Sequence, residues 1–445
     1  MAYLTGDVKA RLADFPPIAT PRDIDPWGVS PCLDANTPAR SKAQQRSARS
    51  GASTRSSKTA TAERVALGTS RIILHPEQKR RLARGNRYRL RDGLRGFTGL
   101  KRLRACGHTA VDSAGVMVRV SGEGENRRAG FAGLSTCGSV WACPVCAAKV
   151  AAERARELTQ VLNWGTEEGL RAALVTLTVR HHAGDSLASV WDAVSSGWAR
   201  VTGGKAWKTA QERYGIKGWA RAVEVTHGGN GWHVHVHAVV LGDAFDDESG
   251  IALGHSMWRR WAAGVRSVGL ESWRDRGGLD VRVSTGGDLG ALGAYLAKQG
   301  ADLEGLAAEA TLGAFKEGRK GSRTPFQIAR SVLETGDAAD VALWREWEQV
   351  SKGRRQLTWS RGLRVQAGLA NERTDEEIAA EEVGTSEDDA VLLPGETWKA
   401  VRESAWLVLD IAEERGVEEL KTWLGWQELA WLEPPKGTPQ KRPKK

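Results

Sequence analysis

The sequence lacks most features that define membrane, secreted and fibrous proteins. Its 445 residues include only five cysteines, too few for a disulfide scaffold in a chain of this length. No run of 18 apolar residues occurs, so we expect no transmembrane helix and no membrane partner. Residues 1–16 lack the apolar stretch of a secretory signal, and no internal repeat is present. These absences favour a cytoplasmic protein. Phenylalanine (6) and tyrosine (4) are scarce beside tryptophan (19), which makes each tyrosine worth examining.

Positive charge is abundant but unevenly placed. The formal net charge is +10, yet residues 37–104 alone hold nineteen Lys and Arg against three acidic residues, a net of +16. Residues 41–61 show no apolar periodicity and have the composition of a disordered segment. Residues 71–104 mix Leu and Ile with many Arg and are expected to be partly helical. Such a basic stretch is either a solvated face or an arm that neutralises phosphates, so nucleic acid is the first partner to consider.

The hydrophobic pattern divides the chain into seven segments. Residues 166–300 alternate strand-like and helix-like stretches in the order β-α-β-β-α-β-α, which favours an α+β fold with helices packed on an antiparallel sheet. Residues 372–389 hold nine acidic residues and one Arg, typical of a solvated linker. The predicted segments are a largely disordered basic arm (1–70), a basic helical and Cys-rich segment (71–165), the strand–helix domain (166–300), a helical Trp-containing extension (301–370), an acidic linker (371–395), a helical region (396–433) and a disordered basic tail (434–445).

The most informative stretch is the predicted strand 232–241. His233, His235 and His237 alternate with valines, so the three imidazoles lie in one row on one face. Packing does not explain such a row, because neutral imidazoles need partners and charged ones repel each other. The pattern indicates a divalent metal site.

A carboxylate on the neighbouring strand would complete this site. Residues 227–231 read as a turn, and a hairpin that turns around Gly229 brings Glu224 across from His235. A metal ion would remove the cost of burying the carboxylate. Two or three His with one carboxylate suit Mg²⁺, Mn²⁺ or a harder transition metal rather than structural zinc.

A predicted helix at 287–299 is rich in small residues, and Tyr295 is its single aromatic. Downstream of a metal-binding strand, this tyrosine is a candidate nucleophile for a phosphodiester polarised by the metal. Lys298 lies one turn later and is a candidate to stabilise the phenolate or contact the phosphate. Asp288 lies two turns earlier and is a candidate to activate a second step. Each residue also has a simpler explanation. Tyr295 could be packed in the core, Lys298 could be solvated, and Asp288 could be a carboxylate favoured at the N-terminus of the helix.

Four cysteines precede this unit and form a candidate structural zinc site. Cys143 and Cys146 form a C-x₂-C knuckle, with Cys137 and Cys106 upstream. A redox pair and inert buried thiols are the alternatives. His108 is a candidate to replace one cysteine, and Cys32 is predicted to be free.

Together these motifs resemble the HUH endonucleases, and more narrowly the single-tyrosine rolling-circle replication initiators of Gram-positive, especially actinobacterial, plasmids. The residues that carry the resemblance span about 125 positions and occur in the family's order. They are Val175–Val179 (Val-Thr-Leu-Thr-Val), Glu224, His233–His237 (His-Val-His-Val-His) and Gly293–Lys298 (Gly-Ala-Tyr-Leu-Ala-Lys).

The resemblance implies a central five-stranded antiparallel sheet with the metal at its centre, preceded by a zinc-ribbon-like segment with four cysteine ligands. It implies origin-specific nicking of one DNA strand by Tyr295, which stays bound to the 5′ end and leaves a 3′-OH primer. His235 and His237 correspond to the two HUH ligands and Glu224 to the third. His233 is an extra ligand or a substrate contact. Related initiators often carry a Glu one turn before the tyrosine, where this chain has Ala291.

The implied partners are plasmid DNA, single-stranded at the nick, and a host helicase and polymerase; the oligomeric state stays open. A relaxase or a transposase would use the same chemistry in another role. A zinc-stabilised DNA-binding regulator without catalysis is the alternative that is not an enzyme.

Overall fold

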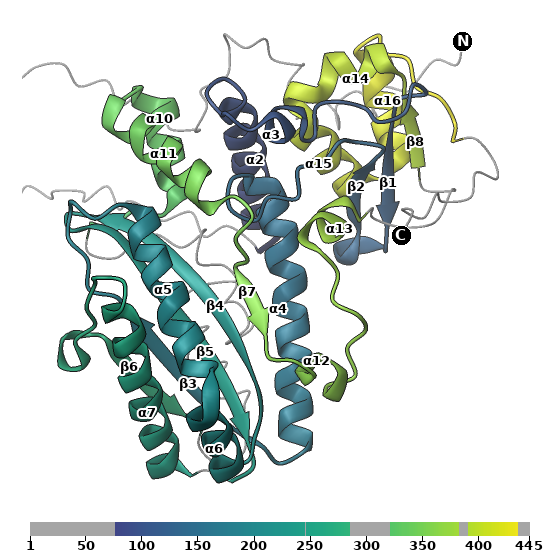
Figure 1. Cartoon of the computed structure of the whole chain (residues 1–445). Helices are drawn as coiled ribbons and strands as arrows, with labels where there is room; N and C mark the ends of the chain where they lie inside the picture. The colour runs from purple at the N-terminus through teal and green to yellow at the C-terminus, as the bar shows by residue number, and fades with distance from the viewer. Residues whose placement is uncertain (1–75, 245, 285–320, 382–389, 435–445) are drawn as a thin grey trace, which may run out of the picture.

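The computed structural model describes residues 76–244, 246–284, 321–381 and 390–434. Figure 1 shows one part built around a sheet of long strands and another part of helices with a small sheet. The long helix α4 (Pro144–Glu167) runs from one part to the other. Within the described ranges, no helix combines the length and the apolar character needed to cross a membrane.

The larger sheet has five antiparallel strands in the order β6-β3-β5-β4-β7. It confirms the antiparallel five-stranded sheet that the sequence and its resemblance predict. The fifth strand comes from the extension that the sequence predicts as helical. The bounds are β3 (Arg171–Thr178), β4 (Ile216–Gly228), β5 (Gly231–Gly242), β6 (Leu279–Val283) and β7 (Leu357–Trp359).

The two faces of this sheet have different coverings. One face carries buried valines, such as Val223 and Val236, and packs under α5 (Leu187–Thr202) and α7 (Asp247–Arg266), with α6 (Gly204–Tyr214) beside them. On the other face, apolar residues of β3, β4 and β5 form a second cluster with residues from the second half of α4. Residues two apart on a strand share a face, so on this face Thr176 follows Leu174 in β3 and Glu224 follows Ala222 in β4. One half of this face is therefore apolar and the other half is polar.

Helices α5 and α7 approach closely because of glycine. A Cβ built on Gly197 would lie 2.7 Å from the Trp261 ring, and one built on Gly264 would lie 2.7 Å from the Ser196 carbonyl oxygen. Trp261 is fully buried at this crossing. The absence of a side chain at both positions therefore lets the large indole fill the space between the helices.

A second, three-stranded sheet joins distant parts of the chain. Strand β1 (Val116–Ser121) pairs with β2 (Arg128–Ala132) on one side and with β8 (Ala390–Leu393) on the other. Helices α14 (Gly395–Val401), α15 (Ala405–Arg415) and α16 (Val417–Trp426) share its apolar core.

The acidic linker predicted at 371–395 needs correction at both ends. Residues Asp375–Ala380 form helix α13, whose Ile378 is buried against α4, and all four residues of β8 are buried. The sequence pattern did not predict these packed elements, because acidic residues dominate the segment and few apolar residues make the contacts. Residues 382–389 lie outside the described ranges.

The predicted boundaries at 165 and 300 do not separate independent cores. A single cluster of buried residues includes Leu90 of α2 (Pro76–Leu94), Val236 of the large sheet and Trp347 of α11 (Ala338–Ser351). Trp344 and Trp347 are both fully buried, as expected for Trp at helical spacing. The remaining helices are α3 (Lys101–Ala105), α10 (Pro325–Thr335) and α12 (Leu363–Gln366).

Much of the positive charge of α2 is neutralised inside the fold. Arg84 contacts Asp410 of α15 at 2.9 Å and also pairs with Glu413, and Arg81 contacts Glu414 at 2.7 Å. These arginines therefore hold the N-terminal part of the described chain to α15. This part of the basic segment therefore has a structural role, and the segment is not a phosphate-binding arm along its whole length.

Candidate active site

The β4–β5 hairpin has the register that the sequence predicts. Gly228 pairs with Gly231 across the turn, and Glu224 lies directly opposite His235. Gly231 has φ +84°, and a Cβ there would lie 2.9 Å from the His182 carbonyl oxygen, so only glycine fits without strain. The turn thus fixes which residues of the two strands face one another.

Three side chains from this hairpin converge on one point. The Nε2 atoms of His235 and His237 are 3.0 Å apart, and the nearer carboxylate oxygen of Glu224 lies 3.3 Å and 3.2 Å from them. Each side chain is 13–16% exposed. Burial alone would raise the pKa of Glu224, but the hydrogen bonds and charges of the two histidines hold it well below its usual value.

A threonine on the next strand orients one of these imidazoles. Thr176 of β3 pairs with His237, and its hydroxyl lies 3.0 Å from Nδ1 of that ring. The contact leaves Nε2 of His237 facing Glu224 and His235. Partners of this kind fix the tautomer and the ring orientation of metal-binding histidines.

The three atoms fit a divalent cation. Adjacent ligands of an octahedral ion with bonds of about 2.1 Å lie about 3.0 Å apart, close to the separations found here. Two neutral imidazoles and one carboxylate also supply the nitrogen and oxygen donors that Mn²⁺ and similar ions accept. Among the described residues, this set is one of two groups of His, Cys, Asp or Glu that could hold a metal ion.

His233 does not join this group. Its ring lies against His235, with centroids 4.9 Å apart, and against His181, with centroids 5.0 Å apart. Burial, with the charges of both neighbours, lowers the pKa of His233 to about 3. The structure therefore places His233 beside the three-atom cluster rather than within it. His181 is a neighbour that the alternating pattern of β5 does not reveal, because it lies just beyond β3.

The candidate nucleophile and its neighbours lie outside the described residues. This applies to Tyr295, Lys298 and Asp288, and also to Ala291. Their assignments remain predictions from the sequence.

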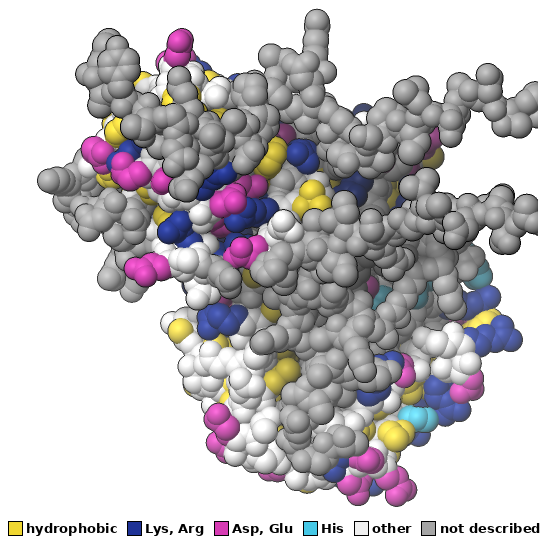
Figure 2. Space-filling model, turned by 180° about the vertical axis from the view of Figure 1, so that it is seen from behind, with side chains coloured by type: hydrophobic (Ala, Val, Ile, Leu, Met, Phe, Trp, Pro, Cys, Tyr) yellow, Lys and Arg dark blue, Asp and Glu magenta, His cyan; other side chains and the backbone are white. Residues whose placement is uncertain are grey.

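From behind, histidine side chains are visible close to Lys and Arg side chains along one side of the molecule (Figure 2).

The two cysteines of the knuckle, together with Cys106 and Cys137, form the second group that could hold a metal ion. Their sulfur atoms all lie within 4.8 Å of one another, and Cys106 Sγ is 3.7 Å from Cys143 Sγ and 3.5 Å from Cys146 Sγ. Cys137 Sγ lies 3.7 Å from Cys146 Sγ, and all four thiols are buried and free of disulfides. Four sulfurs around zinc with bonds of about 2.3 Å would lie about 3.8 Å apart, so the set fits a tetrahedral ion.

His108 does not replace a cysteine. Its Nε2 lies 3.8 Å from Glu403, and its carbonyl oxygen accepts a hydrogen bond from the Trp398 indole at 2.8 Å. Burial, with the charges of Arg95 and Arg402, lowers the pKa of His108 to about 4. Among the described residues, the group that could hold a metal ion here contains the four cysteines and not His108.

Aromatic contacts link the two candidate sites. The Trp347 indole donates to the carbonyl oxygen of Trp141, which lies in the knuckle, at 2.9 Å. The Trp347 ring also stacks on Trp232, with centroids 5.9 Å apart, and Trp232 directly precedes His233. The knuckle therefore supports the strand that carries the histidines.

Comparison with known proteins finds matches to a replication protein family and to two Streptomyces proteins. Residues 132–266 match the sequence model of a family described as replication protein, and this range includes the histidine hairpin and three of the four cysteines, Cys137, Cys143 and Cys146. Protein rep of Streptomyces lividans is 31% identical over 351 residues, covering 64% of this chain and 76% of that protein. A neomycin resistance protein of Streptomyces cyanogenus is 38% identical over 135 residues, covering 24% of this chain and 31% of that protein. No solved structure matches.

The sequence comparisons define the class as a replication protein, and its described fold contains a histidine-bearing antiparallel sheet. The chain belongs to the replication protein family that includes protein rep of Streptomyces lividans.

Proposed function

We propose that this protein initiates rolling-circle replication of a plasmid by nicking one DNA strand at an origin. The observation that carries the proposal is the convergence of Glu224, His235 and His237 on one point of the sheet. A divalent ion held there, Mg²⁺ or Mn²⁺, would polarise the scissile phosphodiester. The family membership supports a role in replication, and the site supports phosphodiester chemistry.

The reaction proposed is a transfer of the phosphodiester to tyrosine. The Tyr295 hydroxyl attacks the scissile phosphorus, so that an O–P bond to tyrosine forms and the bond from phosphorus to the 3′ oxygen breaks. The tyrosine gives up its proton and the departing 3′ oxygen gains one, which leaves a 5′-phosphotyrosine and a 3′-OH. Lys298 is proposed to stabilise the phenolate. Asp288 is proposed to act in the terminating step, because Ala291 stands where related initiators often carry a Glu. The 3′-OH is a primer for a host polymerase, with a helicase opening the duplex ahead.

The cysteine group is proposed to bind structural Zn²⁺. Four buried sulfurs at the spacing of a tetrahedron support this assignment. Burial raises the pKa of the Cys143 thiol well above its ordinary value, so ionised thiols at this depth need a cation. Zinc bound here would hold the start of α4 against the end of α3, which Cys106 follows, and against the loop that contains Cys137.

The test is cleavage of supercoiled plasmid bearing the origin, with Mn²⁺ or Mg²⁺ added. We expect the protein to open the circle and to stay covalently attached to the 5′ end, and mapping of the linked nucleotide would locate the nick. Tyr295→Phe should bind DNA normally and form no adduct. An adduct with this variant would refute the tyrosine assignment, whereas binding without cleavage by either protein would favour a non-catalytic regulator.

A further inference from the structure

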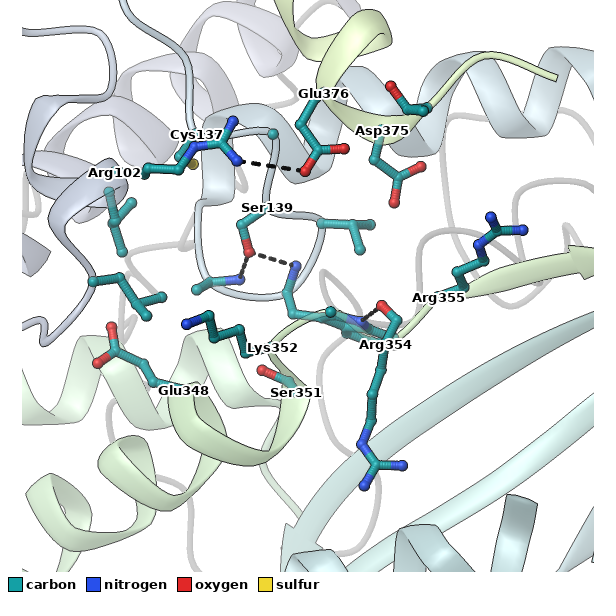
Figure 3. Close-up of a pocket in the computed structure, with 18 of the residues that line it drawn as sticks. Arg102, Cys137, Ser139, Glu348, Ser351, Lys352, Arg354, Arg355, Asp375 and Glu376 are labelled. Atoms are coloured by element: carbon teal, nitrogen blue, oxygen red, sulfur yellow. Dashed lines mark hydrogen bonds and ion pairs between the residues drawn. The ribbon is translucent and has the colours of Figure 1, made fainter. Parts of the chain in front are cut away.

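A cavity of about 730 Å³ lies beside the cysteine knuckle, away from the histidine cluster. Its walls come from the start of α3, the knuckle loop 137–142, the end of α11 with the residues that follow it, and the start of α13 (Figure 3). None of the residues assigned to catalysis or to the histidine cluster lines it. The volume lies in the range of ligand-binding pockets and suits a few nucleotides of a single strand.

Two basic stretches that are far apart in the sequence meet at this cavity. Residues 95–104 contain four Lys and Arg and no acidic residue, and residues 352–355 contain three in four positions. Lys101 lines the cavity from the first stretch, and Lys352 and Arg355 line it from the second. All three are exposed, and none has an ion-pair partner within the described ranges. Figure 3 shows Lys352 reaching into the space near Glu348.

The acidic residues of the cavity are already engaged. Glu348 is buried and accepts hydrogen bonds from the Thr98 hydroxyl and, at 3.1 Å, from the Gly99 N–H. Asp375 pairs with Arg154 at 3.1 Å, and Glu376 with Arg102 at 3.6 Å. Seven Lys and Arg line the cavity against four acidic residues, the fourth being Glu372, which lies 4.0 Å from Arg154, so the excess charge of the lining is positive and favours an anion.

The cavity is lined by Leu357 of β7, the strand that pairs with the one carrying Glu224. Strand β7 pairs with β4 so that Leu357 lies opposite Ala222, and the Val223 N–H donates to the Gln356 carbonyl oxygen at 2.9 Å. The paired residues end at Ala222 and Leu357, and two further steps in the same register would bring Arg355 opposite Glu224. A strand whose phosphates contact Arg355 and Lys352 would therefore run along this edge of the sheet toward the histidine cluster.

We propose that this cavity binds the backbone of single-stranded DNA next to the nick, through Lys101, Lys352 and Arg355. The proposal rests on the proposed nicking function, because it identifies the strand bound there as the one to be cleaved. The contacts are with phosphates, so they position the strand without reading its sequence. Each phosphate that the protein neutralises releases counterions from the DNA. The number of contacts at this site therefore contributes to the slope of log K against log salt.

The test is a triple variant, Lys101→Ala with Lys352→Ala and Arg355→Ala, compared with a matched control. Lys205→Ala with Lys208→Ala and Arg259→Ala removes the same charges from exposed positions on α6 and α7. Affinity for a mixed-sequence single-stranded oligonucleotide is measured by fluorescence anisotropy at several NaCl concentrations. We expect the slope of log K against log salt to fall in magnitude by about two for the cavity variant, at about 0.7 per lost contact, and to stay unchanged for the control.

Further measurements separate a lost phosphate contact from misfolding. Thermal unfolding should show both triple variants folded, and Lys352→Arg alone should retain wild-type binding. Equal slopes for the cavity variant and the wild type would overturn the proposal, and so would an equal weakening of single-strand and duplex binding. Adduct formation by the wild type, measured separately, tests the proposed nicking itself. A wild type that binds through the cavity but forms no adduct would refute the nicking function and leave this site standing.

Discussion

The hydroxyl of Thr176 lies 3.0 Å from Nδ1 of His237, on the side of the ring opposite the nitrogen that faces Glu224. The threonine therefore does not touch the proposed ion but sets the orientation of one of its ligands. Outer contacts of this kind affect metal affinity by about 10- to 100-fold.

Thr176→Val should weaken Mn²⁺ binding by about 10- to 100-fold, because the imidazole loses the bond that fixes its tautomer. Thr176→Ser retains a hydroxyl and should bind nearly as well as the wild type. Thr178→Val is the control, since Thr178 pairs with His235 on the same face but its hydroxyl bonds to no described residue. Calorimetric titration with Mn²⁺ gives the affinities. Equal affinities for Thr176→Val and Thr178→Val would argue against the positioning role.

His235→Ala combined with His237→Ala should abolish nicking while leaving most of the DNA affinity. The change removes two of the three converging atoms, but none of the unpaired cations of the cavity. Nicking of supercoiled plasmid and anisotropy with an oligonucleotide separate the two properties. Cleavage at the wild-type rate would contradict the metal assignment.

Cys106→Ser should lower the zinc content of the purified protein and reduce its melting temperature. Cys106 Sγ lies within 3.7 Å of both Cys143 and Cys146, so its loss opens the tetrahedron. The matched control is Cys32→Ser, because Cys32 is predicted to be free. Elemental analysis together with thermal unfolding provides the measurement, and one zinc per chain in both variants would rule out a four-cysteine site.

Gly197→Ala should destabilise the protein by about 1–3 kcal/mol, because its methyl group would meet the buried Trp261 ring. Gly425→Ala in α16 adds the same methyl group where no atom lies within 4 Å. That change should stabilise the fold by about 0.5–1 kcal/mol through helix propensity. Urea unfolding of the two variants compares them directly. Similar unfolding midpoints would show that α5 and α7 can separate without cost.

Asp410→Asn should change the pH dependence of stability. Burial raises the pKa of Asp410 to about 6, although the charge of Arg84 opposes the shift. An unfolded Asp ionises near about 3.9, so between these values the folded state binds more protons and the contribution of Asp410 to stability falls as the pH rises. The variant lacks this loss, so its stability relative to the wild type should be greater at about pH 7 than at about pH 5. Urea unfolding at both values provides the comparison, and an equal difference at the two would contradict the shifted pKa.

The parts predicted well from sequence are those fixed by local periodicity. Alternation of His and Val defines the face of β5, and the glycines of the turn set its register with Glu224. The four cysteines were also identified from their spacing, and the structure brings their sulfurs together.

The parts that were missed depend on contacts between distant segments. Strand β7 has three residues and no periodicity to detect, and β8 follows a run of acidic residues. The arginines of α2 looked like a phosphate-binding arm because their acidic partners, such as Glu413, lie more than 300 positions away. His181 reaches the histidine row only because β3 ends beside β5.

The pairing of β1 with β8 has a consequence for synthesis on the ribosome. Val116 finds its partner in Leu393, so one edge of β1 has no strand beside it until nearly all of the described chain has been translated. During that time the nascent protein exposes an apolar strand edge, which is a template for association with other chains. The large sheet is complete earlier, once β7 has emerged, so the histidine hairpin can fold while the small sheet is still open.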